Sequence, residues 1–203
     1  MIHINKVVKV LILSDFFLLS AWGLISPILA IFVIENIQGG NAEVVGIAIG
    51  IYWILKSIVQ FPIGKFLDRN HGERDDYYFL IFGTFLAGLV PLGFLVVSLP
   101  WHIYVLQAVH AFAMAMAIPS WGGIFVRHID KGKEAMTWGL DSSSIGIGAG
   151  IAGIIGGFVA EVFGFTPLFI TVSALSIVAA LLFVLIKNDV LPGGQVIYIP
   201  KGL

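Results

Sequence analysis

The sequence predicts an all-α membrane protein in which six transmembrane helices form one bundle. The first observation behind this prediction is composition: the 203-residue chain contains only 11% charged residues, whereas a soluble domain contains about 25%. The second is that apolar windows long enough to cross about 30 Å of hydrocarbon recur six times. The third is that these windows lack the alternation of a β-barrel, which leaves the helix as the structure that satisfies a backbone in lipid.

We place the spans at about 10–34, 44–66, 77–99, 103–126, 136–163 and 167–186. The first run has the length of a full span, so we expect a membrane helix there and not a cleaved signal peptide. Residues 1–187 should form a single transmembrane domain in which short loops make neighbouring helices antiparallel. Residues 188–203 should form a polar tail without fixed structure, although 195–199 could pair as a short strand.

The orientation of the bundle follows from its basic residues. By the positive-inside rule the side that carries Lys and Arg is cytoplasmic, so we expect both ends of a multi-pass protein of the plasma or inner membrane to be cytoplasmic. The lipid bilayer is therefore its first partner. The basic residues that share this side are Lys6, Lys9, Lys65, Arg69, Arg74, Arg127, Lys131, Lys133, Lys187 and Lys201.

Several chemistries are unsupported by the sequence. A net charge of −1 gives no basic surface for nucleic acid, and the absence of cysteine removes disulfides and zinc–thiolate sites. The chain has no P-loop, and a G-x-G-x-x-G match at Gly148, Gly150 and Gly153 lies inside a span with no strand before it. We therefore expect no enzyme activity, no cofactor and no metal site.

Charged, histidine and amide side chains inside the spans are confined to the first, second, fourth and fifth helices. Such residues normally face a bundle interior or a wet cavity, because exposing them to lipid is costly. We infer that these four helices surround a substrate or ion pathway and that the third and sixth are peripheral. The alternative is structural: Lys56 and a carboxylate form an ion pair, and His110 is a packing residue. The candidate pathway residues are Asp15, Lys56, Gln60, Gln107, His110 and Asp141.

Glycine and proline spacing adds two predictions. The fifth span carries glycines spaced four, three and four residues apart on one face, which predicts a flat stripe for close helix packing; these are Gly146, Gly150, Gly153 and Gly157. Pro27 and Pro119 should break the first and fourth spans at matching positions of a three-plus-three repeat. Interrupted helices at corresponding positions indicate a transport site.

The loop between the second and third spans resembles a signature of the major facilitator superfamily, G-x-L-x-D-R-x-G-R. One residue is inserted, since Asn70-His71 stands where one residue is usual, and Glu73 interrupts the basic end. The fifth span is similar to the family's glycine motif without its proline, and Gln107 occupies a position similar to that of a family arginine linked to proton coupling. The signature residues, which we call the gate motif, are Gly64, Asp68, Arg69, Gly72 and Arg74.

The resemblance implies a cavity lined by the first, second, fourth and fifth helices. Because family members usually have two six-helix halves, we expect a homodimer of half-transporters that moves a small solute by secondary-active alternating access. In that dimer Lys56 could reach Asp141 of the other copy, and Asp68 could face the N-terminus of that copy's fifth helix. Two alternatives remain: a subunit that needs a different, paralogous six-helix chain, and a non-transport assembly or sensor protein.

Overall fold

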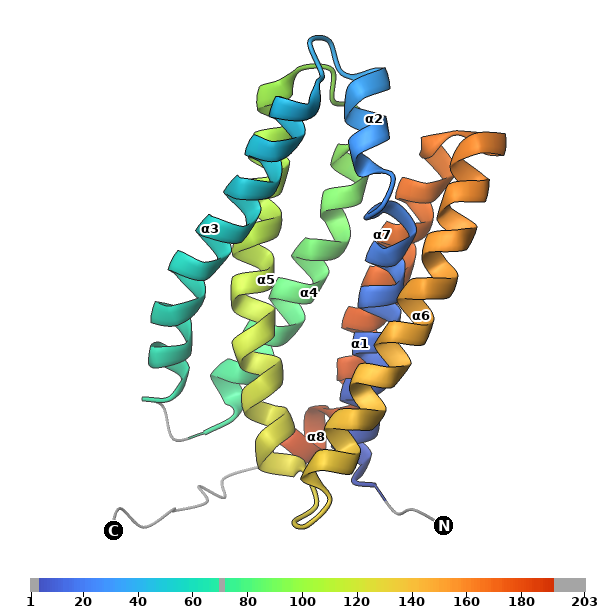
Figure 1. Ribbon diagram of the computed structural model, residues 1–203. Coiled ribbons are helices and arrows are strands. Elements are labelled where there is room, and N and C mark those ends of the chain that lie inside the picture. The colour runs from blue at the N-terminus through green and yellow to red at the C-terminus, as the bar shows by residue number, and fades with distance from the viewer. Residues whose placement is uncertain (1–3, 70–71, 192–203) are drawn as a thin grey trace.

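The computed structural model describes residues 4–69 and 72–191, and within these ranges all regular secondary structure is helical (Figure 1). Six helical segments are long and apolar enough to cross a membrane within the described ranges, which confirms the predicted fold class. The last of these segments runs from Phe165 to Val190. The elements are α1 (Lys6–Ile25), α2 (Leu29–Asn36), α3 (Ala42–Leu67), α4 (Arg74–Gly93), α5 (Pro100–His128), α6 (Glu134–Phe163), α7 (Phe165–Leu182), the 3₁₀ turn η1 (Phe183–Ile186) and α8 (Lys187–Val190).

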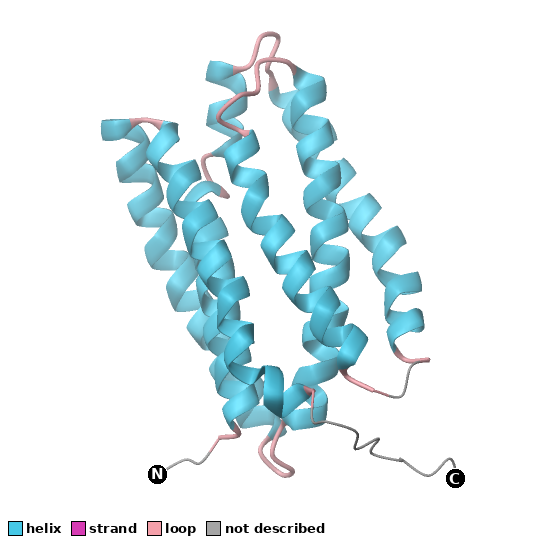
Figure 2. Cartoon of the chain, turned by 180° about the vertical axis from the view of Figure 1, so that it is seen from behind, coloured by secondary structure: helices cyan, strands magenta, loops and turns pink. Residues whose placement is uncertain are grey.

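Most of the predicted tail, residues 192–203, lies outside the described residues, and so does the possible strand at 195–199. The described part of the tail continues the last span as α8. Loops gather at the two ends of the bundle (Figure 2). We call the end where α1 begins and α8 ends the basic end, because Lys6, Arg74 and Arg127 all lie there.

Local sequence explains where several helices start and stop. The side chains of Asn5 and Asn41 accept backbone N–H groups of Val7 and Val44, which caps the starts of α1 and α3. Gly164 alone separates α6 from α7, and its φ of +77° lies in the region that favours glycine. The chain therefore reverses direction there in a single residue.

The two predicted helix breaks have different outcomes. The break at Pro27 is confirmed, because α1 ends at Ile25 and α2 begins at Leu29. The break at Pro119 is wrong, because α5 continues through this residue without interruption. Proline is tolerated inside membrane helices when neighbouring helices pack around it, and here α5 is packed between α3 and α4.

Helix pairing follows a three-plus-three exchange. In Figure 1, α3 lies along α5 on one side of the bundle and α6 lies along α1 on the other. The α4–α5 pair corresponds to the α7–α1 pair, and α4 and α7 pack on each other to join the two sides. When the first three spans are exchanged with the last three, each extensive contact corresponds to an equivalent contact, and the α4–α7 contact corresponds to itself. Because α1 starts at the basic end and α5 at the opposite end, the two repeats are inverted.

Burial within the described chain separates two helices from the other four. Half of the most apolar window of α4 and 44% of that of the α7 segment are buried, against 17% for both α3 and α6. α5 and α1 are buried to the same extent, 50% and 44%, so within the described chain only α3 and α6 are poorly covered. Which helices surround a cavity stays a prediction, because burial inside one chain does not locate that cavity.

Small residues allow two very close helix crossings. A Cβ added to Gly156 or Gly148 on α6 would overlap Leu24 or Ser20 of α1, and one added to Gly83 on α4 would lie 2.6 Å from the Ala113 carbonyl oxygen of α5. The predicted packing stripe does not make these crossings within the described chain. Its members Gly146, Gly150 and Gly157 have open space where a Cβ would be, and Gly153 makes only ordinary contacts near 3.8 Å.

Candidate functional site

The candidate pathway residues lie on the four predicted helices, in two separate groups. Asp15 is on α1, Lys56 and Gln60 on α3, Gln107 and His110 on α5, and Asp141 on α6. Lys56, Gln107, His110 and Asp141 are all buried, with exposed fractions from 4% to 9%. The structure brings Lys56 together with His110, and Asp15 together with Asp141. It does not bring Lys56 to either carboxylate.

His110 lies at the centre of an aromatic stack that joins three helices. The Trp22 ring of α1 stacks on its ring with a centroid distance of 3.8 Å and an interplanar angle of 8°. The Tyr52 ring of α3 also stacks on His110, with centroids 4.7 Å apart. Trp22 and Tyr52 in turn pack against a buried apolar cluster that contains Leu18 and Met114. The imidazole is therefore held by ring contacts on both sides.

Lys56 extends from α3 over two of these aromatic residues. Its Nζ atom lies 3.8 Å from the Trp53 ring centroid and 5.3 Å from that of Tyr52. An ammonium over an aromatic face is attracted by the ring quadrupole. Among the residues that the structure describes, no carboxylate lies within 4.0 Å of this ammonium. The structural alternative, an ion pair between Lys56 and a carboxylate, is thus not formed within the described chain. We call the five residues Trp22, Tyr52, Trp53, Lys56 and His110 the aromatic–lysine cluster.

Asp15 and Asp141 form a carboxylate pair between α1 and α6. They are close enough for their charges to interact. The Asp141 side chain is 4% exposed, and its Oδ1 atom has no hydrogen-bond partner within residues 4–69 and 72–191. The Ser144 hydroxyl next to it donates instead to the Asp141 backbone carbonyl.

An open groove of about 730 Å³ runs along α3 from Ser57 towards the basic end. It contains Gln60 and three members of the gate motif, namely Gly64, Asp68 and Arg69. Gly64 faces Pro119 of α5 at ordinary contact distance. The other two members of the motif are placed outside this groove: Gly72 has open space around it, and Arg74 is the first residue of α4. The complete groove lining is Ser57, Gln60, Phe61, Gly64, Lys65, Asp68, Arg69 and Pro119.

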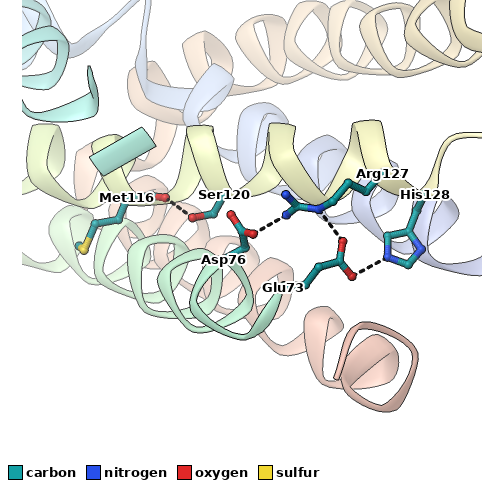
Figure 3. A network of polar contacts seen from close by, with 6 residues as sticks. All are labelled: Glu73, Asp76, Met116, Ser120, Arg127 and His128. Carbon is teal, nitrogen blue, oxygen red and sulfur yellow. Dashed lines mark hydrogen bonds and ion pairs between the residues drawn. The ribbon is translucent and has the colours of Figure 1, made fainter. Parts of the chain in front are cut away.

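A network of charged residues at the basic end was not predicted. Arg127 at the end of α5 donates from Nε to Glu73 Oε1 at 2.8 Å and from Nη2 to Asp76 Oδ2 at the start of α4 (Figure 3). His128 Nε2 lies 2.8 Å from Glu73 Oε2. Burial acts to raise the pKa of Glu73, but the hydrogen bonds and charges of His128 and Arg127 together hold that pKa below its ordinary value. Gly123 leaves room for this network, since a Cβ there would lie 3.1 Å from the guanidinium.

The sequence contained a signal for this network. Glu73 was interpreted only as an interruption of the gate motif, yet it begins a helix whose antiparallel neighbour ends in Arg127 and His128. Acidic residues at the start of one span and basic residues at the end of the next lie on the same side of a membrane. The Trp22 and Tyr52 stack on His110 could not be found in this way, because it depends on the rotation of three helices.

Comparison with known proteins places these features in a family. The chain is 26% identical over 187 residues to an uncharacterized MFS-type transporter of Methanocaldococcus jannaschii, covering 92% of this chain and 47% of that protein. It is 28% identical over 175 residues to the multi-drug resistance efflux pump PmrA of Streptococcus pneumoniae, covering 83% of this chain and 42% of that protein. The chain thus spans about half the length of the curated relatives it matches. The family model described as Major Facilitator Superfamily matches residues 11–196, so the chain belongs to this superfamily of membrane transporters, which are not enzymes.

Proposed function

We propose that this chain forms one half of a secondary-active transporter that moves a small solute by alternating access. The observation that carries this proposal is the set of buried polar side chains on α1, α3, α5 and α6. His110 Nε2, Trp22 Nε1 and Asp141 Oδ1 have no hydrogen-bond partner within the described part of the chain. Buried polar groups are normally satisfied, and a solute, a proton or the other half of the transporter would satisfy them.

The second half, in this proposal, is another copy of the chain. The matches cover less than half of each relative, which supports a second six-helix unit. In a twofold dimer about the membrane normal, α3 of one copy would meet α6 of the other copy across an isologous interface. These two helices are the least covered ones in the described chain. The aromatic–lysine cluster and the carboxylate pair would then face a cavity between the copies.

The basic end is cytoplasmic in this proposal, in accord with the positive-inside rule. The gate motif and the Glu73–Arg127 network then lie at the inner mouth of the cavity. Asp68 would face the positive N-terminus of the other copy's α6 in the state closed to the cytoplasm. The carboxylate pair would take up or release a proton as the cavity changes side.

The first test is the subunit count in lipid nanodiscs by native mass spectrometry. We expect two copies of this chain per particle. A single copy would overturn the homodimer, and a second, different membrane protein in the particle would replace it with a heterodimer.

Crosslinking tests the interface in a chain that has no native cysteine. Ile54 on α3 and Ile147 on α6 are 63% and 65% exposed and lie at the same depth from the basic end of their helices. Ile54→Cys combined with Ile147→Cys should form a disulfide between copies. The matched control is Ile54→Cys with Phe158→Cys, because Phe158 is 63% exposed but lies three turns deeper on α6. Equal crosslinking of both pairs would contradict the proposed arrangement.

Transport itself is tested in proteoliposomes. Lys56→Ala and Asp141→Asn should each abolish solute-dependent flux while the protein remains folded and dimeric. Lys131→Ala is the control, because this lysine is exposed in the loop before α6. Transport at the wild-type rate in both Lys56→Ala and Asp141→Asn would contradict the proposal that these residues line the transport pathway.

A further inference from the structure

Opposite charges are separated inside the bundle. Lys56 lies over Tyr52 and Trp53, and Tyr52 stacks on His110, whereas the two intramembrane carboxylates, Asp15 and Asp141, lie on α1 and α6. The aromatic–lysine cluster therefore contains a cation, whereas the acidic groups form a separate pair. A solute that binds in the cluster meets positive charge.

The Lys56 ammonium has no anionic partner among the residues that the structure describes. Its side chain is only 9% exposed, and a buried charge is costly unless it is paired and hydrogen-bonded. The rings of Tyr52 and Trp53 offset part of this cost through their π faces, but they accept no strong hydrogen bond. The ammonium has three donors, and the described chain gives it no carboxylate.

The neighbouring polar atoms favour the same ligand. The indole Nε1–H of Trp22 can only donate a hydrogen bond, and this atom is buried without a partner in the part of the chain that the structure describes. His110 Nε2, which is also buried and unpaired there, can donate when it carries the proton. A carboxylate, which is an acceptor only, satisfies both an ammonium and an indole N–H.

The walls of the cluster indicate the rest of the ligand. Trp53 is 56% exposed, and Trp22 and Tyr52 are half-buried, so ring faces or edges remain available beside the ammonium. Aromatic groups prefer offset-stacked or edge-to-face contacts with such rings. A planar apolar body attached to the anionic group would fill this space.

The groove lies between the cluster and the basic end along α3. Ser57 and Gln60, which line it, lie within about one helical turn of Lys56 on α3. Its outer part carries Lys65, Arg69 and one acidic residue, Asp68. Two cations against one carboxylate attract an anion to the mouth.

We propose that the solute is an organic anion with a planar aromatic body, whose carboxylate binds Lys56 and Trp22 Nε1 while its ring packs in the aromatic–lysine cluster. This inference rests on the proposed transport function and names the class of solute. In this proposal the partner of Lys56 is the carboxylate of the solute and not a carboxylate of the other half.

The experiment compares three probes that share one ring system and differ in charge. They are 2-naphthoate, 2-naphthalenemethanol and 2-naphthylmethylammonium, each measured by equilibrium dialysis against the full chain in nanodiscs, with empty nanodiscs correcting for partition into lipid. We expect 2-naphthoate to bind about 10- to 100-fold more tightly than the neutral probe, the range given by one charge-assisted hydrogen bond. The cationic probe should bind least.

Substitutions assign the preference to a residue. Lys56→Gln should remove the advantage of 2-naphthoate and leave the neutral probe unchanged, while Lys56→Arg should retain most of it. Lys131→Gln is the matched control, because it removes an exposed loop charge and should change nothing. Circular dichroism and thermal unfolding establish that each variant is folded, and Lys56→Arg keeps the test valid if Lys56→Gln does not fold.

The outcomes separate this inference from the proposed function. Equal binding of the neutral and anionic probes, preference for the cation, or no binding of any probe would overturn the inference even in a protein that is dimeric and transports. A Lys56-dependent preference for 2-naphthoate in a protein that proves monomeric would support the anion site and overturn the homodimer alone.

Discussion

The crossing of α1 and α6 gives a stability prediction that turns on two adjacent glycines. A Cβ at Gly156 would overlap the carbonyl group of Leu24, and the three nearest atoms are all Leu24 backbone. A Cβ at Gly157 would meet nothing within 4 Å. Gly156→Ala and Gly157→Ala therefore make the same chemical change at neighbouring positions of one helix, with contact on one side and space on the other.

The expected effects have opposite signs. Replacing glycine by alanine inside a helix stabilises it by about 0.5–1 kcal/mol, and both variants gain this. Forcing a methyl group into a packed contact costs about 1–3 kcal/mol, and only Gly156→Ala bears this cost, since backbone atoms of α1 cannot move aside without moving the helix. We therefore expect Gly156→Ala to unfold with about 1–3 kcal/mol less free energy than Gly157→Ala.

The assay is equilibrium unfolding in mixed micelles, with rising dodecyl sulfate in dodecyl maltoside and helicity followed by circular dichroism. A nonionic detergent that dissociates the copies keeps contacts between them out of the comparison. Unfolding of the two variants at the same detergent fraction, or lower stability of Gly157→Ala, would contradict the close contact between Gly156 and the Leu24 backbone.

The charged residues at the basic end give three more predictions. Arg127→Met should lower the free energy of unfolding by about 2–3 kcal/mol, because Asp76 is 2% exposed and would lose its cation; Arg127→Lys should recover part of the loss in the same micelle assay, and equal stability of Arg127→Met and wild type would contradict the assignment. The pKa of Glu73 is lower in the folded protein than its ordinary 4.5, so its stabilisation is present above pH 4.5 and disappears as the pH falls through the folded value. In Glu73→Gln the free energy of unfolding should therefore decrease less between pH 4.5 and lower pH than in the wild type. An equal decrease in both proteins would contradict this prediction. Lys6 and Asp189 are 63% and 40% exposed, so a double-mutant cycle should give a coupling of about 0–1 kcal/mol that decreases in high salt, and a salt-independent coupling would contradict this.

The sequence predicted features that depend on composition and on charge along the chain. The six spans are confirmed, and the break at Pro27 is confirmed, in accord with the missing N–H and the steric bulk of proline inside a helix. Placement of the polar groups on four helices also followed from the sequence, since the cost of charge in lipid is independent of how the helices are rotated.

Features that depend on which face of a helix packs against another helix could not be predicted from composition and charge. On α6, Gly148, Ala152 and Gly156 are spaced by four residues and pack on α1, whereas the more conspicuous stripe that begins at Gly146 does not. Spacing shows that small residues share a face, but the partner helix decides which face is used. Pro119 was predicted to break its helix for a similar reason, because the sequence does not show how α3 and α4 pack around α5.

The exchange of partners between the two repeats has a consequence for biosynthesis. Among the described spans α1 is made before its close neighbours α6 and α7, and α3, α4 and α5 are made in between. The nascent α1, with Asp15 in its interior, must therefore wait in the bilayer or in the insertion machinery while three further spans are made before α6. The α4–α5 pair is contiguous in the chain and can assemble during synthesis, so completion of the fold depends on the late return of the C-terminal hairpin to the first helix.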